Sequence, residues 1–435
     1  MKFRFFEMFD YLLLICMSLL ILVGILFIYS SGVNSDSVSV SKEYIKQIIF
    51  ACSGLLITIF FAVFDYRQLK RLVPAAFAVF LFVLIYTLRF GRYVNGASSW
   101  LGIGGFGIQP SEFGKIVYIM FLARYLESSE TAAPLERLCK GALITAVPVL
   151  LILKQPDMGT ASVYIPVFVG MLFASGVNVT YILFIVFTGA LTVIFTILPV
   201  WQEVILKKTA LFINVFTDNR LRLIVVTTLL IVTFIGTLGF ILYRNRYYQL
   251  ITWIAGGITL AFGASIAGGK VLKDYQIKRL IVFLDPYTDP LGAGWNIIQS
   301  KIAIGSGGIM GQGFLKGTQS HYRFLPQQST DFIFSILSEE AGFIGSLFVF
   351  LLFMIMLLRI IFIIHGTKNL FGYYIAVGIL VMFFFHFVIN VGMVMGIMPI
   401  TGIPLVFLSY GGSSLWTAMW AIGLLMSIQY RRLNF

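Results

Sequence analysis

Apolar stretches of about 20 residues recur along the whole chain, and each is long enough to cross roughly 30 Å of hydrocarbon as a helix. Short polar segments separate them. The alternation of apolar and polar residues that marks the strands of a membrane β-barrel does not occur. The pattern therefore predicts an all-α polytopic membrane protein with about twelve spans. The predicted spans cover residues 9–30, 45–64, 72–89, 112–126, 139–153, 160–175, 178–199, 223–242, 248–268, 332–362, 371–394 and 403–428.

Composition agrees with a chain that lies in lipid. Hydrophobic residues make up 59% of the 435 residues and charged residues only 11%, whereas a soluble domain carries about 25% charged residues. The net charge of +13 would suggest nucleic acid for a soluble protein, but many Lys and Arg residues flank the apolar stretches, so we expect no nucleic-acid partner. Cys16, Cys52 and Cys139 show no paired spacing, which indicates neither a disulfide framework nor a metal cage.

Basic clusters set the predicted orientation, because cytoplasmic loops carry an excess of Lys and Arg. The clusters fall in alternate loops, at residues 66–71, 137–140, 243–246 and 430–432. Both termini are therefore expected in the cytoplasm, with Trp100, Asp157 and the long stretch 269–331 outside it. The same count places residues 200–222 outside, although four basic residues oppose this: Lys207, Lys208, Arg220 and Arg222.

The stretch 269–331 is unusually basic for a segment outside the membrane. Either loops of this length tolerate any charge, or an anionic ligand such as a lipid diphosphate head group binds there. Residues 297–304 are apolar but too short to span, which predicts an interfacial helix. Residues 305–313 are rich in glycine and either bind an anion through backbone N–H groups or form ordinary turns. The basic residues are Lys270, Lys273, Lys278, Arg279, Lys301, Lys316 and Arg323.

Asp331 lies at the expected outer start of a helix, directly before the apolar run 332–334. The local pattern leaves two roles open for it. An Asp in this position often caps a helix by accepting a hydrogen bond from a backbone N–H group. If Ser329 or Thr330 caps the helix instead, the carboxylate is left for catalysis.

Two more acids, Glu339 and Glu340, lie further along the same predicted helix, roughly 12–13 Å beyond Asp331 at 1.5 Å per residue. Adjacent helical residues point about 100° apart, so we expect the two carboxylates not to share one task. One is expected to face a polar cavity or to pair with a basic residue of another helix. A purely structural ion pair is an equal alternative.

Glu112 and Lys115 open the fourth predicted span at a spacing of i,i+3. The pair either stabilises the start of a helix or lines an outer cavity, and the sequence does not separate these roles. His321, His365 and His386 show no metal-ligand spacing, and packing is the preferred role of the last two.

Several ordered motifs closely resemble the SEDS family of shape, elongation, division and sporulation proteins, above all its elongation branch. The resemblance covers nearly the whole chain except about residues 205–268. The motifs are Trp100 with residues 109–115 (QPSEFGK), 155–161 (QPDMGTA), 285–300 (DPYTDPLGAGWNIIQS), 317–319 (GTQ), 324–326 (FLP), 330–334 (TDFIF) and 399–414 (PITGIPLVFLSYGGSS).

The resemblance implies a peptidoglycan glycosyltransferase of the bacterial inner membrane that joins lipid II into glycan strands during elongation and maintenance of cell shape. It also implies a class B penicillin-binding transpeptidase as partner. Asp331 matches the catalytic Asp of the TDFIF motif, and Trp100 matches an outer-loop Trp required for activity. No metal site is assigned, and a divalent cation, Mg²⁺ or Mn²⁺, is left open as a cofactor. The predicted cavity or substrate residues are Trp100, Glu112, Lys115, Lys154, Asp157, Lys301, Gln319, Glu339 and Glu340.

The chain departs from the family in length. SEDS proteins resemble bundles of about ten helices, and two further apolar spans here predict an inserted transmembrane hairpin within residues 205–268. We expect residues 1–435 to form one integral membrane domain, with 269–331 as a large outer loop. Two other functions remain alternatives: a lipid II flippase that uses buried Glu339, Glu340 and Lys154, and a non-catalytic scaffold for the transpeptidase.

Overall fold

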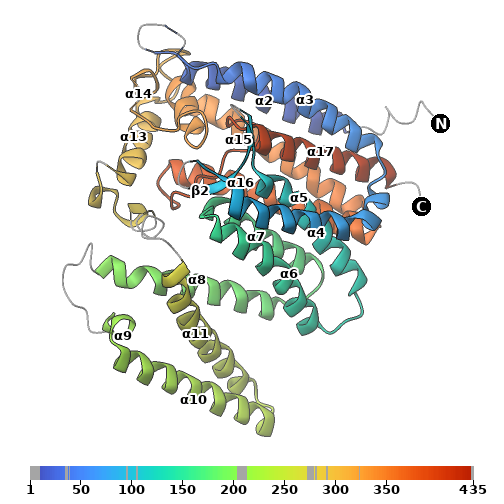
Figure 1. Cartoon of the computed structure of the whole chain (residues 1–435), viewed down its shortest axis with the longest axis vertical. Coiled ribbons are helices and arrows are strands. Elements are labelled where there is room, and N and C mark those ends of the chain that lie inside the picture. Colours follow the sequence, from blue (N-terminus) through green and yellow to red (C-terminus); the bar gives the residue numbers. More distant parts are fainter. Residues whose placement is uncertain are drawn as a thin grey trace. The chain divides into compact units, whose positions relative to one another are not determined.

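The computed structural model is largely helical (Figure 1). It describes residues 10–34, 38, 40–94, 97–103, 106–202, 213–271, 279, 282–290, 292–322 and 324–432. The chain divides into two compact units. The main unit comprises Met1–Gly176 with Trp295–Phe435, and the second unit comprises Val177–Gly294.

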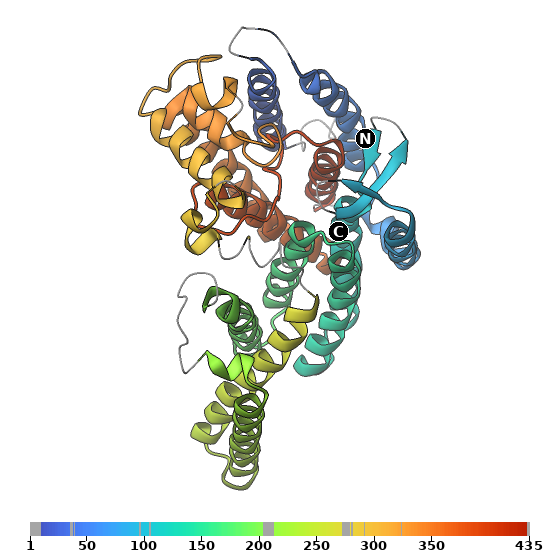
Figure 2. The same ribbon diagram turned by 60° about the vertical axis from the view of Figure 1, so that its left-hand side comes forward.

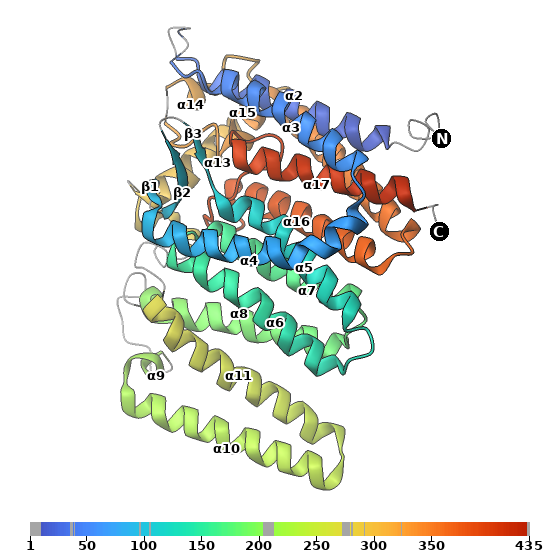
Figure 3. The same cartoon turned by 45° about the vertical axis from the view of Figure 1, so that its right-hand side comes forward.

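The main unit is a bundle of long helices with a small sheet and two short helices at one end. The first six helices among its described residues are α2 (Tyr11–Ser31), α3 (Glu43–Val63), α4 (Tyr66–Phe90), α5 (Pro110–Ser128), α6 (Pro134–Lys154) and α7 (Met158–Ala174). Its later helices are α13 (Ala293–Ser306), α14 (Thr318–His321), α15 (Ile333–Gly366), α16 (Leu370–Val394) and α17 (Gly412–Arg431). α2 begins and α17 ends at one end of this unit, and the sheet, α13 and α14 lie at the other (Figure 3).

Every predicted span falls on a helix, so the chain is an all-α polytopic membrane protein. Among the described residues, 8 helices are long and apolar enough to cross a membrane, and α7 is a shorter apolar helix. The last predicted span, 403–428, is wrong at its start, because residues 403–411 form a loop and α17 begins at Gly412. α13 confirms the predicted short helix around residues 297–304.

Glycines let the helices of the main unit approach closely, as small residues do in membrane bundles. A Cβ on Gly54 of α3 would lie 2.3 Å from Sδ of Met419 in α17. In return, a Cβ on Gly423 would lie 2.7 Å from the carbonyl oxygen of Thr58. The hydroxyl of Thr58 also donates to the carbonyl of Met419 at 2.9 Å. Small side chains thus hold α3 and α17 together along their length.

A three-stranded antiparallel sheet in the order β1-β2-β3 interrupts the helices (Figure 2). Its strands are β1 (Arg92–Val94), β2 (Ala97–Ile103) and β3 (Phe106–Ile108). The sequence analysis predicted only helices and missed this sheet, although the dipeptide Asn95-Gly96 is a strong sequence signal for a hairpin. Trp100 lies on β2, and its ring covers Gly107, where a Cβ would lie 2.8 Å from Cε3.

α15 is broken near its N-terminal end. Its 34 residues would measure about 51 Å as one helix, more than the thickness of a bilayer core. Gly342, with φ 64° and ψ −159°, divides it into two helical pieces. The prediction of one continuous span at 332–362 is therefore wrong, because a glycine adopts a backbone conformation that L residues rarely adopt.

The glycine-rich run 305–313 packs against this break. The amides of Gln312 and Gly313 donate to the carbonyls of Glu339 and Glu340, each at 3.0 Å. Beyond the break, the amide of Phe343 donates to the carbonyl of Gly308 at 2.9 Å. The run thus satisfies backbone groups that the broken helix cannot pair internally. The anion-binding interpretation of this run is wrong for Gln312 and Gly313, because their N–H groups bind protein.

The second unit contains α8 (Val179–Trp201), α9 (Asn214–Thr217), α10 (Asn219–Tyr243), α11 (Arg246–Val271) and the 3-10 helix η2 (Pro286–Thr288). α10 and α11 pack against each other, and α11 also packs against α8. Phe184 of α8 contacts Trp253 of α11 with ring centroids 5.0 Å apart. The two apolar stretches predicted as a hairpin are therefore paired helices. Residues 203–212 and 272–278, with Lys207, Lys208, Lys273 and Lys278, lie outside the described residues, as does Arg323.

The break in α15 makes a prediction for stability. Gly342→Ala should lower the free energy of unfolding by about 1–3 kcal/mol, because φ is positive and the new Cβ would lie 2.3 Å from the nitrogen of Gly311. Gly305→Ala is the matched control in the same run, since nothing lies within 4 Å of its Cβ. Thermal denaturation in detergent measures both, and equal melting temperatures for the two variants would contradict the packing described here.

Candidate functional site

The connection between α16 and α17, residues 395–411, is a non-helical segment that we call the central loop. Three of its residues have positive φ: Gly396 at 72°, Gly402 at 70° and Phe407 at 68°. Irregular backbone in a membrane bundle needs partners from the protein, since no water is available in hydrocarbon. Those partners are side chains of surrounding helices, and they decide where the loop lies.

Helices on two sides hold the central loop. On α3, Gln47 Nε2 donates to the carbonyl of Ser409 at 3.2 Å, and Gln47 Oε1 accepts from the amide of Gly411 at 3.2 Å. On α16, Asn390 Nδ2 donates to the carbonyl of Ile403 at 2.8 Å. Gln47 and Asn390 are both fully buried. The loop is therefore fixed by amide side chains that the apolar pattern of the helices did not reveal.

Asp331 lies against this loop and is half-buried. Its Oδ2 would lie 3.4 Å from a Cβ on Gly402, and its carbonyl accepts a 3.0 Å hydrogen bond from Asn390 Nδ2. The N-cap residue of α15 is Phe332, which makes no side-chain capping hydrogen bond, so Asp331 lies one residue before the N-cap position. The amide of Tyr410 donates to the carbonyl of Ser329 at 2.8 Å, which ties the same segment to the end of the loop.

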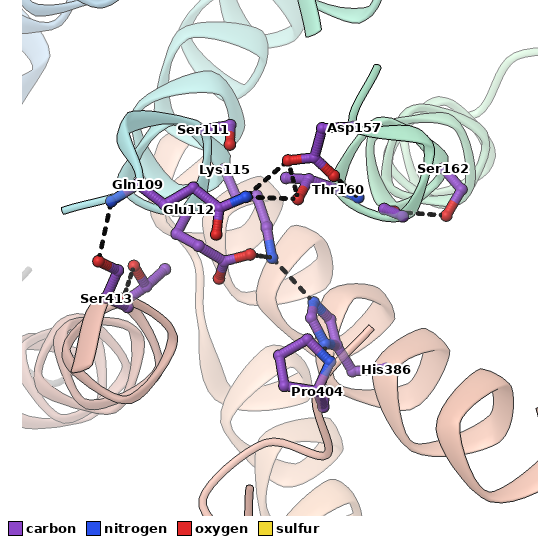
Figure 4. A network of polar contacts seen from close by, with 12 residues as sticks. Gln109, Ser111, Glu112, Lys115, Asp157, Thr160, Ser162, His386, Pro404 and Ser413 are labelled. Carbon is purple, nitrogen blue, oxygen red and sulfur yellow. Dashed lines mark hydrogen bonds and ion pairs between the residues drawn. The ribbon is translucent and has the colours of Figure 1, made fainter. Parts of the chain in front are cut away.

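Glu112 and Lys115 form a buried ion pair, with side chains 5% and 3% exposed and Nζ 2.8 Å from Oε1. The two side chains approach His386 of α16 (Figure 4), and Nζ of Lys115 lies 3.1 Å from Nε2 of His386. Nδ1 of His386 lies 3.1 Å from the carbonyl oxygen of Pro404 in the central loop. A carbonyl only accepts, so Nδ1 carries the hydrogen and Nε2 accepts from the Lys115 ammonium. His386 is buried in the bundle, in agreement with the predicted packing role, and it makes these polar contacts in addition.

Asp157 is the N-cap of α7, a role that its carboxylate fills by accepting from the amide of Thr160 at 3.1 Å. Oδ2 also accepts from Thr160 Oγ1 at 2.9 Å and from Gln109 Nε2 at 2.6 Å (Figure 4). A Cβ on Gly159 would lie 2.4 Å from the carbonyl oxygen of Thr401. The start of α7 therefore abuts the central loop one residue before Gly402.

Glu339 and Glu340 bind a single segment, residues 315–321. Glu339 accepts from the amide of Gln319 at 2.8 Å and from Thr318 Oγ1 at 3.1 Å. Glu340 accepts from the amide of Leu315 at 3.2 Å, and its carboxylate lies 3.7 Å from His321 Nε2. It also accepts from Ser30 Oγ of α2 at 2.5 Å. The expectation that the two carboxylates cannot share a task is wrong, because the segment passes over both at the break in α15.

The remaining predicted residues occupy different surroundings. Lys301 is exposed, and a Cβ on Gly396 would lie 2.3 Å from its Cε. Gln319 is half-buried, and its Oε1 makes no hydrogen bond to any of the described residues. Trp100 shares β2 with Ser98, whose amide donates to the carbonyl of Gln155, near Asp157, at 3.1 Å. Lys154 is exposed at the end of α6, so its expected burial is wrong.

A cleft of about 410 Å³ opens between the end of α2 and the segment held by Glu339 and Glu340. Its lining includes Gly317 and Thr318 of the GTQ motif. It is lined by Tyr29, Val33, Asn34, Leu315, Lys316, Gly317, Thr318, His321 and Tyr322. Within the described ranges, no group of three or more His, Cys, Asp or Glu side chains could hold a metal ion.

The central loop thus lies against Asp331 and Lys301. It also contacts His386, which binds Lys115, and Gly159, which lies in the first turn of the helix that Asp157 caps. Asn390 was missed by the sequence analysis, and His386 was assigned to packing alone. A signal did exist, since polar side chains four residues apart in an apolar membrane helix are costly and commonly functional.

Comparison with known proteins gives one family. The family model for FtsW, RodA and SpoVE, described as a cell cycle protein, matches residues 10–223 and 222–434. The chain is 52% identical over 433 residues to peptidoglycan glycosyltransferase RodA of Treponema pallidum, with 100% of both chains covered. It is 33% identical over 430 residues to stage V sporulation protein E of Bacillus subtilis, with 96% of each covered. It is 32% identical over 421 residues to peptidoglycan glycosyltransferase MrdB of Escherichia coli K12, with 97% and 93% covered.

Solved structures share the fold. A chain from a structure described as showing the structural coordination of polymerization and crosslinking by a peptidoglycan synthase complex aligns with a TM-score of 0.65. It is 25% identical, with 98% of this chain and 99% of that chain covered. The rod shape determining protein RodA of Thermus thermophilus aligns with a TM-score of 0.60 at 21% identity, with 98% of each covered, which bears on the fold alone.

The ion pair of Glu112 and Lys115 makes a prediction for stability. Lys115→Met should lower the free energy of unfolding by about 3–5 kcal/mol, because it leaves a buried carboxylate without its partner. The double variant Glu112→Gln with Lys115→Met removes both charges and should recover most of that loss. Thermal denaturation in detergent compares them. A single variant as stable as the unaltered protein would show that the pair is not buried as described.

Proposed function

Because the chain belongs to the FtsW, RodA and SpoVE family of cell cycle proteins, we propose that it is a peptidoglycan glycosyltransferase. Its substrate is lipid II, which it polymerises into glycan strands during cell-wall elongation and the maintenance of cell shape. One observation supports the site in particular. Asp331, the Asp of the TDFIF motif, is held against the central loop. The same loop contacts Lys301 and His386, and His386 binds Lys115.

The proposed reaction is a displacement at an anomeric carbon. The 4-hydroxyl of the acceptor sugar forms a bond to the anomeric carbon of the donor, whose bond to the lipid diphosphate breaks. The hydroxyl proton goes to a base, and the diphosphate leaves with the bonding electron pair. Asp331 is the proposed general base, a role that typically contributes about 10²–10⁴-fold to the rate. Its Oδ2 would lie 3.4 Å from a Cβ on Gly402, so the carboxylate lies against the central loop.

Positive charge is needed where the diphosphate leaves. Lys301 is the proposed contact for it, because this residue is exposed and the end of its side chain lies against Gly396 of the central loop. Lys115 contributes positive charge from a buried position, because Glu112 and His386 hold its ammonium in place. A divalent cation, Mg²⁺ or Mn²⁺, would enter with the diphosphate, because Mg²⁺ is commonly bound by one or two carboxylates and substrate phosphates.

The partner and the membrane belong to the same proposal. A class B penicillin-binding transpeptidase would cross-link the strands, and the likeness to a chain of a peptidoglycan synthase complex supports it. The chain is a multi-pass membrane protein, and we place it in the bacterial inner membrane. With both termini in the cytoplasm, the end that carries the sheet, α13 and α14 (Figure 3) faces outward.

Transport of lipid II finds no support in the charged residues that suggested it. Lys154 is exposed, and Glu339 and Glu340 are occupied by hydrogen bonds to residues 315–320. Detergent-solubilised protein has no two sides, so strand synthesis in detergent identifies an enzyme. Retained lipid II binding without synthesis would favour the flippase, and full complementation by a variant that lacks Asp331 would favour the scaffold.

Asp331→Asn should reduce strand synthesis from purified lipid II by about 10²–10⁴-fold, because the amide cannot take up the proton of the acceptor hydroxyl. The measurement is the amount of glycan strand formed in detergent over time. Asp218→Asn is the matched control, since Asp218 caps α10 at an exposed position and should leave synthesis unchanged.

Asp331→Asn protein should keep the melting temperature and lipid II affinity of the unaltered protein. Near-normal synthesis by this folded variant would remove Asp331 from the mechanism.

A further inference from the structure

α16 carries two buried polar side chains one helical turn apart. His386 is 2% exposed and Asn390 is 0% exposed, within a helix that is otherwise almost wholly apolar. Residues four apart lie on the same helix face, and here that face meets the central loop. The two side chains bind consecutive carbonyls of the loop, those of Pro404 and Ile403. α16 therefore holds the loop at two adjacent points.

Asn390 reaches beyond the loop to the segment that carries the carboxylate. Its amide nitrogen donates to the carbonyl of Asp331 at 3.0 Å and to that of Ile403 at 2.8 Å. An amide NH₂ has two hydrogens, so both are used. The amide oxygen is buried and makes no hydrogen bond to the part of the chain that the structure describes. The asparagine thus uses both N–H groups to join the central loop to the segment that carries Asp331.

His386, on the same face of α16, makes the corresponding contact to Lys115. With Nδ1 donating to the carbonyl of Pro404, Nε2 is the acceptor that receives a hydrogen bond from Lys115. One face of α16 thus contacts both the backbone of Asp331 and the ammonium of Lys115. Because a helix is rigid over a single turn, it sets the separation of these two groups.

We propose that Asn390 and His386 are positioning residues, with Asn390 fixing Asp331 and His386 fixing Lys115. The inference rests on the proposed function, in which the carboxylate of Asp331 takes up a proton. In the same function the ammonium of Lys115 contributes positive charge where the diphosphate leaves. Neither positioning residue needs to touch the substrate. A displacement of about 1 Å at a reacting group can cost about 10²-fold in rate, so a lost hydrogen bond in this position acts mainly on kcat.

Asn390→Leu tests the contact to Asp331, because leucine has a similar size and no N–H group. We expect kcat for strand synthesis to fall by about 10–100-fold, with KM for lipid II changed by less than about twofold. Thr58→Val is the matched control, since it also removes a buried side-chain hydrogen bond to a carbonyl, that of Met419, between α3 and α17. It should match Asn390→Leu in melting temperature and retain the kcat of the unaltered protein.

A second measurement separates positioning from a general structural role. Asp331→Glu places the carboxylate one methylene further from the backbone than in the unaltered protein. The carboxylate of this variant is already displaced, so its residual activity depends less on the hydrogen bond that Asn390 makes to the backbone of residue 331. Asn390→Leu should therefore lower the rate of the Asp331→Glu protein by less than about threefold, a non-additive result expected of residues that act together. A structural role predicts the same factor in both backgrounds.

The His386 contact is tested with two substitutions. His386→Gln keeps one donor and one acceptor, whereas His386→Leu keeps neither. We expect kcat to decrease from the unaltered protein to His386→Gln and further to His386→Leu. Equal losses in both variants would overturn the role assigned to this histidine.

Several results would overturn the role of Asn390. These are a kcat for Asn390→Leu equal to that of Thr58→Val, a loss confined to KM, or additive effects with Asp331→Glu. If Asn390→Leu does not fold, Asn390→Ser replaces it, and failure of both to fold would assign Asn390 to folding instead. Absence of strand synthesis by the unaltered protein, or full activity of Asp331→Asn, would reject the proposed function itself.

Discussion

The rest of the structure depends on one constraint: the buried non-helical backbone of the central loop must find its hydrogen-bond partners inside the helix bundle. A buried peptide group without a partner costs several kcal/mol. Gln47, His386 and Asn390 supply partners from α3 and α16. Because these side chains come from rigid helices, satisfying the loop also fixes its position. Asp331 lies beside the loop and shares one of its partners, so its location follows from the same requirement.

The same constraint explains the second polar region of the protein. The break at Gly342 interrupts the hydrogen bonding of α15, and the glycine-rich run supplies amides to the carbonyls before it. Glu339 and Glu340, next to the break, bind the amides of residues 315–320. Glycine is needed where two backbones come this close, as at Gly311. Conspicuous acids and glycines can therefore serve the architecture of a membrane protein, and the carboxylate of Asp331 is distinguished from them by its different surroundings.

The sequence predicted the helices and pointed to Asp331 as the candidate catalytic residue. It did not predict the contacts that determine where Asp331 lies. Apolar length is a local property, so the spans could be read directly, and the TDFIF motif identified the carboxylate. The conformation of Gly342 depends on contacts with residues about 30 positions away, and no local pattern carries that information. His386 and Asn390 were visible only as polar residues in an apolar helix. Their role needed the central loop, whose path is set by tertiary packing.

The central claim is that the carboxylate at the central loop takes up the proton of the acceptor hydroxyl. The most direct test is the pH dependence of the single-turnover rate of strand synthesis, compared between the unaltered protein and Asp331→Asn. The account predicts that the unaltered rate rises with pH as one carboxylate loses its proton and then levels off. In Asp331→Asn the residual rate should lack that rise. A variant that keeps the same rise would contradict the assignment of Asp331 as the base.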